Sequence, residues 1–350
     1  MLGVPSSQAK VQKPYNIAIL VLNYNGKIHL EVCIESILAQ IGPEERLYLV
    51  DNGSTDGSDE YIRSHYPGVG LIRLERNLGY AEAYNRAVGM ISEELVVFLN
   101  NDVEVAENWL AALKSEFERS GGLVAVCGSM LLFYHNRDLV NHAGGKISPI
   151  GGGIDIGFMK PDEGKERHPA FVGCVSGASM MVLRSVFLEV GGFDRDFFAY
   201  FEDVDFCWRA WLTGYRILFV PSSRVHHKLS STMGPFLRPK RLFLGERNRL
   251  QSMLKNLEWK NLLAGLFVSV VYNLTRFLKF LGSGKPNAVL AVLRADLWVL
   301  GHLLIILQKR RRVQNRRRYS DSYLLRHGLL TTFTDGFREF SRLENLRSKH

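Results

Sequence analysis

The sequence predicts an α/β fold, doubly wound around a mostly parallel sheet with helices on its flanks. Short apolar runs typical of strands alternate with stretches whose apolar residues recur at helical spacing, and the loops between them are short. Clusters of turn-forming residues follow the runs. Ligands of such sheets bind at the carboxyl ends of the strands, so polar residues at those ends are the first candidates for a site.

The first hundred residues supply the expected elements in order. Four strands are predicted over residues 17–22, 47–50, 69–74 and 95–99. Helices are predicted over residues 29–40, between the first two strands, and 81–91, between the last two. The polar clusters at residues 23–26, 51–56 and 100–102 then all fall at carboxyl strand ends, which is the first indication of function.

Two later regions have a different composition. Residues 144–157 are glycine-rich, which indicates either a mobile loop or an ordinary surface connection. The stretches 262–281 and 288–307 are apolar but are broken by charges such as Arg276 and Asp296. A membrane-spanning helix needs roughly 20 apolar residues with few charges. We therefore expect an amphipathic helical pair that packs on the rest of the protein or lies in a membrane interface.

Charge is distributed unevenly along the 350 residues. The whole chain has 44 Lys and Arg against 35 Asp and Glu, a net charge of +9. Residues 1–233 hold 21 basic and 28 acidic residues, a net of −7, whereas residues 234–350 hold 23 and 7, a net of +16. We expect a catalytic domain over residues 1–235 and a basic helical region over residues 236–350. The basic region should seek an anionic partner such as lipid headgroups.

The cysteines and the N-terminus bear on the compartment. Four cysteines are scattered without a CxxC pair, which favours a reducing compartment. The first residues lack the apolar core of a signal peptide. We expect catalysis on the cytoplasmic side of a membrane.

Taken singly, the polar clusters are ambiguous. Asp51 could accept hydrogen bonds from a base or ribose, but Asp after a strand is commonly a turn or helix cap. Asp102 could hold Mg²⁺ or Mn²⁺ through oxygen ligands, or it could cap a helix over residues 107–118.

Taken together, the motifs of residues 15–250 resemble family 2 glycosyltransferases, which have the GT-A fold. The order is Leu-Asn-Tyr-Asn-Gly, Val-Asp-Asn-Gly-Ser-Thr-Asp-Gly, Asn-Leu-Gly-Tyr-Ala and Leu-Asn-Asn-Asp, followed by Gly-Ala-Ser-Met, Gly-Gly-Phe-Asp, Tyr-Phe-Glu-Asp-Val-Asp, Val-His-His-Lys and Arg-Asn. Within the family the sequence looks closest to the rhamnosyltransferase-like branch that builds bacterial cell-surface polysaccharides. The resemblance implies a dTDP-rhamnose donor, with UDP-hexoses as alternatives, and a glycan or polyprenyl-linked acceptor.

The resemblance also implies roles for particular residues. Asp102 would be the surviving metal ligand of an Asp-x-Asp motif whose first Asp is Asn100 here. His227 would help to coordinate the metal or the diphosphate, although His226 stands beside it. The donor nucleotide would be bound by Asn23, Asn25, Asp51, Asn77 and Asn101.

The acceptor side is assigned in the same way. Asp203 would be the general base, preceded by Glu202 in the acidic pair. Phe201, Asp205 and Trp208 would contact the acceptor. Taken alone, the acidic residues would more often be a solvated helix start, since isolated charges usually lie at the surface, and the aromatic residues could be plain core. Attack by a hydroxyl with one base predicts inversion, and a divalent cation would stabilise the departing diphosphate.

Three other classes were weighed. A dinucleotide-binding oxidoreductase needs G-x-G-x-x-G after the first strand, which is absent from the sequence. The basic run 309–318 lacks interleaved aromatics, so an anionic membrane is a better partner for it than nucleic acid. An inactive sugar-nucleotide-binding protein stays open because Asn replaces an acid in the metal motif.

Overall fold

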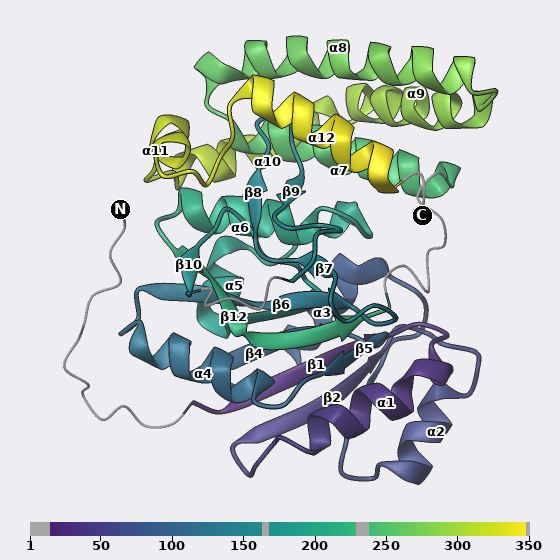
Figure 1. The fold of residues 1–350 in the computed structure, drawn as a ribbon, viewed down its shortest axis with the longest axis vertical. Coiled ribbons are helices and arrows are strands. Elements are labelled where there is room, and N and C mark those ends of the chain that lie inside the picture. The colour runs from purple at the N-terminus through teal and green to yellow at the C-terminus, as the bar shows by residue number, and fades with distance from the viewer. Residues whose placement is uncertain (1–14, 163–167, 229–237, 348–350) are drawn as a thin grey trace.

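A mixed sheet lies at the centre of the molecule, as the computed structural model of residues 15–162, 168–228 and 238–347 shows (Figure 1). Its strands follow the order β10-β12-β6-β11-β4-β1-β2-β3, with β5 paired to β12 and β7 to β6. The α/β fold predicted from the sequence is confirmed. The strands are β1 (Ile17–Asn23), β2 (Glu45–Asp51), β3 (Gly70–Arg73), β4 (Leu95–Asn100), β5 (Val103–Val105), β6 (Val124–Phe133), β7 (Val140–His142), β8 (Gly145–Ile147), β9 (Gly153–Asp155), β10 (Ala170–Phe171), β11 (Ser179–Leu183) and β12 (Arg216–His227).

The four predicted N-terminal strands form the parallel half of this sheet. β1 pairs in parallel with both β2 and β4, and β2 pairs in parallel with β3. The register sets Asn23 opposite Asp51, and Leu22 opposite Asn100. The three polar clusters therefore meet at one edge of the sheet, as the sequence predicted.

Helices cover both faces of the sheet. Alternate β1 residues face opposite cores: Ile17, Ile19 and Val21 pack towards α1 and α4, whereas Ala18 and Leu20 pack towards α3, α5 and α6. This period of two is the pattern of a strand buried on both sides. The helices of this half are α1 (Lys27–Leu38), α2 (Ser58–His65), α3 (Gly79–Gly89), α4 (Trp109–Arg119), α5 (Arg184–Val190) and α6 (Glu202–Leu212), with a short 3₁₀-helix, η1 (Arg195–Phe197).

The glycine-rich stretch 144–157 is neither a mobile loop nor a plain surface connection. It contains a hairpin in which β8 pairs antiparallel with β9. Added Cβ atoms would collide with Cys174 Sγ at Gly145 (2.7 Å) and with Val204 Cγ2 at Gly153 (2.8 Å). The glycines here let the hairpin pack closely against the start of α6.

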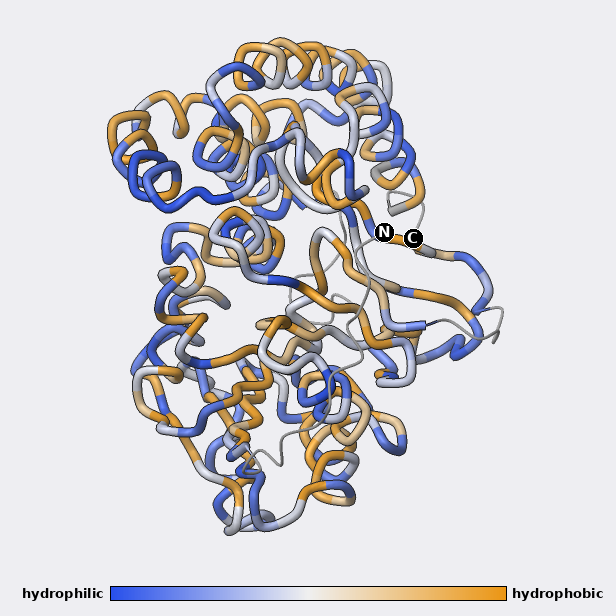
Figure 2. Tube along the Cα trace, turned by 90° about the vertical axis from the view of Figure 1, so that its left-hand side faces the viewer, coloured by the Kyte–Doolittle hydropathy of each residue, from blue (hydrophilic) through white to orange (hydrophobic). Residues whose placement is uncertain are grey.

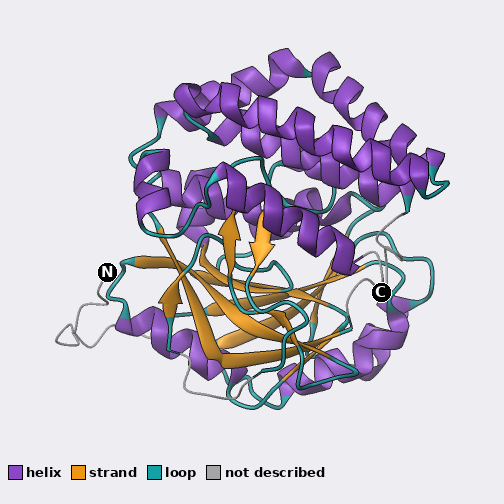
Figure 3. Ribbon diagram, turned by 45° about the horizontal axis from the view of Figure 1, so that its top comes forward, coloured by secondary structure: helices purple, strands orange, loops and turns teal. Residues whose placement is uncertain are grey.

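The C-terminal helices stack over the α6 side of the sheet (Figure 3). The first of them packs on the catalytic body, since buried Leu250, Met253 and Leu254 join the core of the sheet. The predicted domain boundary at 235/236 lies outside the described residues. These helices are α7 (Pro239–Asn256), α8 (Trp259–Gly282), α9 (Pro286–Gly301), α10 (Leu303–Asn315), α11 (Asp321–Arg326) and α12 (Phe333–Arg347).

One described helix, α8, is long and apolar enough to cross a membrane by length and composition. The pair of α9 and α10, bent by 69°, would be a second only if it counted as one span. The charges that interrupt the two apolar stretches partly face inward, because buried Arg276 pairs with Glu246 (2.8 Å) and Asn273 contacts Asp296 (3.2 Å). What remains outside is strongly apolar, and much of the uppermost helix is coloured hydrophobic in Figure 2.

Candidate active site

A cavity of about 940 Å³ opens at the carboxyl edge of the sheet, between the polar strand ends and the start of α6. Most of the site residues predicted from the sequence line it: Asn77, Asn101, Asp102, Phe201, Glu202, Asp203 and His227. Asn23 and Asp51 are buried behind its wall, and Asn25 is exposed and does not line it. Two, Asp205 and Trp208, lie away from it.

Asn23 and Asn25 connect the polar strand ends through hydrogen bonds. The Asn101 amide donates to Asn23 Oδ1 (2.6 Å), and the Asn23 amide donates to Ser54 Oγ (3.2 Å). Asn25 Oδ1 accepts the backbone N–H of Thr55 (2.8 Å). These amides join the ends of β1, β2 and β4 into one network, so they orient the wall that a donor would meet.

Asp51 makes a turn contact with one carboxylate oxygen and leaves the other without a hydrogen bond to any residue that the structure describes. It is fully buried, and its Oδ1 accepts the backbone N–H of Ser54 (3.3 Å), which is a turn contact. Its Oδ2 has no hydrogen-bond partner among the described residues, and Arg73 Nε lies 3.9 Å away. A buried carboxylate oxygen in this state can accept a hydrogen bond from a ligand such as a nucleobase N–H.

Asn52 belongs to the same wall and was missed by sequence reasoning. Its amide donates to Asn77 Oδ1 (3.1 Å), and its Oδ1 accepts the backbone N–H of Leu78 (2.9 Å). The turn before α3 is thereby fixed to the end of β2. Within the motif Val-Asp-Asn-Gly, this Asn looked like a simple turn former.

The Asp102–His227 pair is assembled by β5 and β12. The antiparallel register sets His227 opposite Val103, and the backbone N–H of Lys228 donates to the Asp102 carbonyl (2.9 Å). His227 Nε2 therefore lies 3.3 Å from Asp102 Oδ1. His226 points elsewhere: it does not line the cavity, and burial lowers its pKa.

Hydrogen bonds fix the tautomer of His227. Its Nδ1 lies 3.0 Å from Asn141 Oδ1, an acceptor, so Nδ1 carries the proton. The one lone pair of its Nε2 accepts from the Asn100 amide (3.3 Å), so Asn100 would have to give up this contact for a metal to bind there. A metal-binding histidine is oriented in this way by a partner behind it. Asn100, in the position where the motif usually has an acid, thus contacts the histidine rather than adding a charge.

The donor set fits a hard divalent cation held jointly with a substrate. The described residues contain no group of three or more His, Cys, Asp or Glu able to hold a metal alone. Asp102 and His227 supply one carboxylate and one imidazole lone pair. Mg²⁺ is commonly bound by one or two carboxylates together with substrate phosphates, so two protein ligands suffice.

The acidic pair begins α6, where the helix dipole favours negative charge. Asp203 Oδ2 accepts the backbone N–H of Gly177 (2.8 Å), and its Oδ1 accepts that of Val204 (2.7 Å). Burial raises the pKa of Asp203 despite these bonds. Burial and the Asp203 charge raise the pKa of Glu202 well above its ordinary value, and Glu202 Oε2 has no partner in the described chain. Both carboxyls are therefore harder to ionise than usual, and the rise in pKa is the larger at Glu202.

The segment before the acidic pair is strained. Phe198, Tyr200 and Phe201 all have positive φ, at 60°, 74° and 65°, and all line the cavity. Non-glycine residues held in such conformations cost about 1–3 kcal/mol each and persist only where their surroundings impose them. This 198–201 turn forms the aromatic wall next to Asp203.

Arg247 and Asn248 of α7 impose that conformation. The Asn248 amide donates to the carbonyls of Phe197 (2.9 Å), Ala199 (2.9 Å) and Tyr200 (2.8 Å). Arg247 donates to the carbonyl of Phe197 (3.0 Å). Both side chains are buried, so the Arg-Asn motif braces the turn from within the protein.

Asp205 and Trp208 do not meet the prediction that they contact an acceptor. Asp205 is fully buried and is satisfied by Arg209 (2.8 Å), Ser252 (2.8 Å), Lys255 (3.1 Å) and Asn256 (3.0 Å). Trp208 is fully buried in the core of the sheet. Helical periodicity explains the difference, because only the first turn of α6 reaches the cavity.

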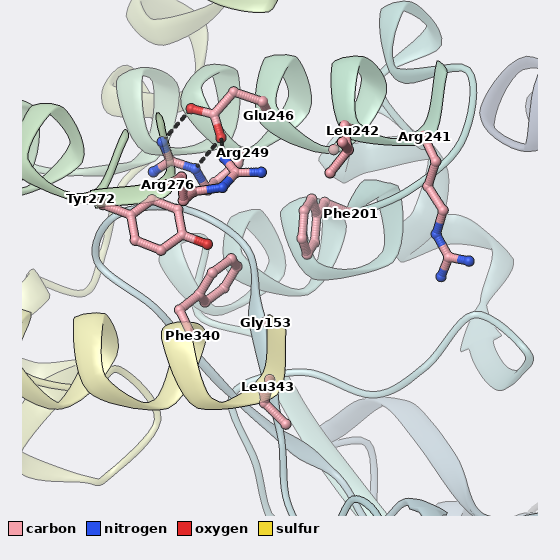
Figure 4. Close-up of a pocket in the computed structure, with 11 residues that line it drawn as sticks. Gly153, Phe201, Arg241, Leu242, Glu246, Arg249, Tyr272, Arg276, Phe340 and Leu343 are labelled. Carbon is pink, nitrogen blue, oxygen red and sulfur yellow. Dashed lines mark hydrogen bonds and ion pairs between the residues drawn. The ribbon is translucent and has the colours of Figure 1, made fainter. Parts of the chain in front are cut away.

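A smaller cavity of about 60 Å³ adjoins the large one and shares Gly153, Phe201, Arg241 and Gly245 with it. Figure 4 shows its aromatic side formed by Phe201, Tyr272 and Phe340, with Glu246 held between Arg249 and Arg276 at one end. Although burial opposes it, the two guanidinium groups hold the pKa of Glu246 at about 2. This ion cluster ties α7 to α8 beside the aromatic wall of the 198–201 turn.

A mixed sheet with an acidic cavity at the carboxyl ends of its parallel strands is the architecture of GT-A sugar-transferring enzymes. The chain belongs to glycosyl transferase family 2. The family's sequence model, Glycosyl transferase family 2, matches residues 18–189, and the model for Glycosyl transferase family group 2 matches residues 164–334. The protein is thus a glycosyltransferase, as the sequence predicted.

Individual relatives refine this result. An N-acetylglucosaminyl-diphospho-decaprenol L-rhamnosyltransferase of Mycobacterium tuberculosis is 31% identical over 242 residues, which are 62% of this chain and 77% of that protein. A poly-beta-1,6-N-acetyl-D-glucosamine synthase of Staphylococcus epidermidis is 25% identical over 227 residues, and the match covers 64% of this chain and 52% of the synthase. The relatives are glycosyltransferases of cell-surface polysaccharide synthesis, and the rhamnosyltransferase-like assignment is confirmed.

Solved structures confirm the GT-A fold. GalNAc-T7, determined with UDP, GalNAc and Mn²⁺, matches with a TM-score of 0.57 and 19% identity over 70% of this chain and 48% of that one. A mannosyltransferase from Pyrobaculum calidifontis, in complex with GDP-Man and Mn²⁺, matches with a TM-score of 0.51 and 15% identity over 97% and 89% of the two chains.

Proposed function

We propose that the protein transfers rhamnose from dTDP-rhamnose, with inversion, to a lipid-linked glycan in cell-surface polysaccharide synthesis. The observation that carries the proposal is that the Asp203 carboxylate and the Asp102–His227 pair line one cavity from different elements. The donor and acceptor follow the similarity to the mycobacterial rhamnosyltransferase, which this chain covers over 77% of its length.

The chemistry assigned to the chain's own residues is direct displacement. Asp203 takes the proton of the acceptor hydroxyl as the new bond from that oxygen to the anomeric carbon forms. The bond from the anomeric carbon to the diphosphate oxygen breaks on the opposite side, and its electron pair leaves with the nucleoside diphosphate. Asn77 and Asn101 line the donor part of the cavity, with Asp51 behind them. A single displacement inverts the anomeric configuration.

Asp102 and His227 are the residues proposed to hold a divalent cation, Mn²⁺ or Mg²⁺. Bound there with the donor diphosphate, the cation would stabilise the negative charge that develops on the leaving group. The His227 lone pair and the Asp102 carboxylate face the same space, which supports this assignment. The solved GalNAc-T7 and mannosyltransferase complexes contain Mn²⁺, in line with the same expectation.

We also propose that α8 and α9 rest on the cytoplasmic face of an anionic membrane without crossing it. Exposed apolar side chains recur on one face of each helix at helical spacing: Leu263, Phe267, Val270, Leu274, Leu278 and Leu281 on α8, and Leu290, Leu293, Leu297 and Leu300 on α9. Such a stripe suits insertion into the headgroup boundary. A lipid-linked acceptor would present its sugar close to that surface.

The basic run 309–318 supplies fewer charges to this surface than the sequence suggests. Lys309 pairs with Asp194 and Asp196, and buried Arg310 donates to the Leu254 carbonyl (2.7 Å). Arg317 pairs with Asp321 (3.1 Å). The exposed residues Arg311, Arg312, Arg316 and Arg318 remain for anionic headgroups, each contributing on the order of 1 kcal/mol near a charged surface.

The test is a turnover panel with the purified full chain. It offers dTDP-rhamnose, UDP-glucose, UDP-N-acetylglucosamine and GDP-mannose with Mn²⁺ or Mg²⁺, and a short-chain N-acetylglucosaminyl-diphospho-lipid as acceptor. We expect rhamnosyl product only from dTDP-rhamnose, with the anomeric configuration inverted by NMR coupling constants. Transfer from a UDP-hexose alone would replace the donor assignment, and retention of configuration would overturn the displacement mechanism.

A further inference from the structure

A histidine–carboxylate pair faces the cavity and has no part in the mechanism above. His142 ends β7 and Asp155 ends β9, and both line the cavity. His142 Nδ1 lies 2.8 Å from Asp155 Oδ1. His142 is 5% exposed, and its Nε2 is buried without a hydrogen-bond partner in the described residues.

The carboxylate fixes the tautomer of this ring. Asp155 can only accept, so the neutral imidazole carries its proton on Nδ1 and leaves a lone pair on Nε2. Burying a ring nitrogen without a partner is unfavourable, because the nitrogen loses the hydrogen bond that water would supply. A group that is retained in this state at a cavity wall is explained by a ligand that donates a hydrogen bond to it.

The position of the pair assigns it to the acceptor side. The hairpin that carries Asp155 packs against the start of α6, where the Cβ of a residue at position 153 would lie 2.8 Å from Val204, directly after Asp203. Besides burial, the Asp155 charge raises the pKa of the Asp203 carboxyl, so the carboxylate of the pair lies within electrostatic reach of Asp203. On the same strand, Asn141 instead contacts His227. Strand β7 thus separates the donor side from the acceptor side.

We infer that His142 Nε2 accepts a hydrogen bond from a second hydroxyl of the acceptor sugar, next to the one that attacks, and that Asp155 is the positioning residue that keeps the lone pair on that nitrogen. The inference rests on the proposed function and adds a specificity-determining contact to it. The ligand class is a sugar with a free hydroxyl within reach of the attacking one. Asp203 remains the base.

The experiment measures kcat/KM for the N-acetylglucosaminyl-diphospho-lipid and for analogues that lack one free sugar hydroxyl each. We expect His142→Ala to lower acceptor kcat/KM by roughly 3- to 15-fold, the range of one neutral hydrogen bond, through KM rather than kcat. With the wild-type chain, one deoxy analogue should have its kcat/KM lowered by the same factor. With His142→Ala, that analogue should have the same kcat/KM as the full acceptor. Melting with dTDP and Mn²⁺ should show unchanged donor binding.

Two further variants separate positioning from structure. The Asp155→Asn variant can present its amide N–H to His142 Nδ1, which moves the ring proton to Nε2 and turns Nε2 into a donor. This variant should no longer discriminate against that same deoxy analogue. Its melting temperature with dTDP should equal that of the wild type. His226→Ala, outside the cavity, is the matched histidine control and should keep acceptor kcat/KM.

The outcomes are distinct. Additive losses for His142→Ala and every deoxy analogue would overturn the inference, as would a loss of 100-fold or more in kcat with all acceptors, which would make His142 a proton acceptor. If the wild-type chain transfers no sugar from any donor, the proposed function fails instead.

Discussion

Replacing Asp203 by Asn should separate catalysis from stability. The variant removes the proton acceptor, and losing an acid–base group costs roughly 10²–10⁴-fold in rate, which corresponds to about 2.7–5.4 kcal/mol of barrier. The donor side is untouched, because the residues assigned to it lie at or just after the ends of β1, β2 and β4 and in the turn before α3. Donor binding should therefore stay within about twofold.

The stability change is worked from two opposing contributions. The Asp203 carboxylate accepts two backbone N–H groups, and an amide can accept only one of them, which costs about 1–2 kcal/mol. Against this, burial raises the pKa of Asp203 in the folded state. The stability that the protonated carboxyl contributes is therefore fully present below the unfolded-state pKa of 3.8. It is lost as pH rises through the higher folded-state pKa. Asn removes that loss, so the net change at neutral pH should be small.

The assay combines initial transfer rates with melting at pH 5 and pH 8. Glu202→Gln is the matched control: it removes the partner whose pKa is raised further, so it should melt higher at pH 8 and lose transfer far less than Asp203→Asn. The wild-type rate should fall on the acid side at a pH above the ordinary carboxyl range, as Asp203 is protonated. Near wild-type transfer by Asp203→Asn would refute the assignment of the base.

Three other variants test the remaining parts. Asn248→Ala removes three hydrogen bonds from the strained turn, so it should lower stability by about 1.5–4 kcal/mol and raise acceptor KM more than donor KM; equal effects on both substrates would contradict a brace. Asp102→Asn should abolish the rescue by Mn²⁺ or Mg²⁺ that follows EDTA treatment of the wild type, and full activity in excess EDTA would remove the metal from the site. The double variant Phe267→Glu, Leu274→Glu should reduce flotation with anionic vesicles, whereas Met90→Glu, at an exposed position of the catalytic domain, should not. If the full chain does not bind anionic vesicles at low salt, the membrane proposal is wrong.

Local patterns predicted the parallel half of the sheet because its determinants are local. Buried strands read as apolar runs, and the turn formers after β1, β2 and β4 mark the edge where the donor wall forms. The pairing of Asp102 with His227 could not be derived from spacing, since 125 residues separate them and only the β5–β12 register joins them. This pairing was predicted from the resemblance to family 2 glycosyltransferases, which rests on the order of the motifs.

The errors have a common physical cause. Asp205 and Trp208 stand within an acidic, aromatic motif, but the helix turns them away from the cavity by its 3.6-residue period. His142, Asp155 and Asn141 were missed because they lie in and beside a glycine-rich stretch that carries no strand pattern. Its hairpin is held by close packing on α6, which no local pattern records.

The C-terminal helices are part of the catalytic unit and not an appendage to it. Lys255 of α7 pairs with Asp194 (2.5 Å) and Asp205 (3.1 Å), and Lys309 of α10 reaches the same Asp194. Although burial opposes it, these lysines hold the pKa of Asp194 well below its usual range. Helix α7, which braces the 198–201 turn, is thus joined to the catalytic domain by the buried ion pairs of Lys255. On its other side, Glu246 joins α7 to α8, one of the two helices with exposed apolar side chains. Removing one partner of a buried ion pair typically costs 3–5 kcal/mol, so these helices cannot be detached without disturbing the turn that precedes Asp203. A membrane contact along α8 and α9 would therefore hold the acceptor wall at a fixed height above the lipid, which is the geometry that a lipid-linked sugar requires.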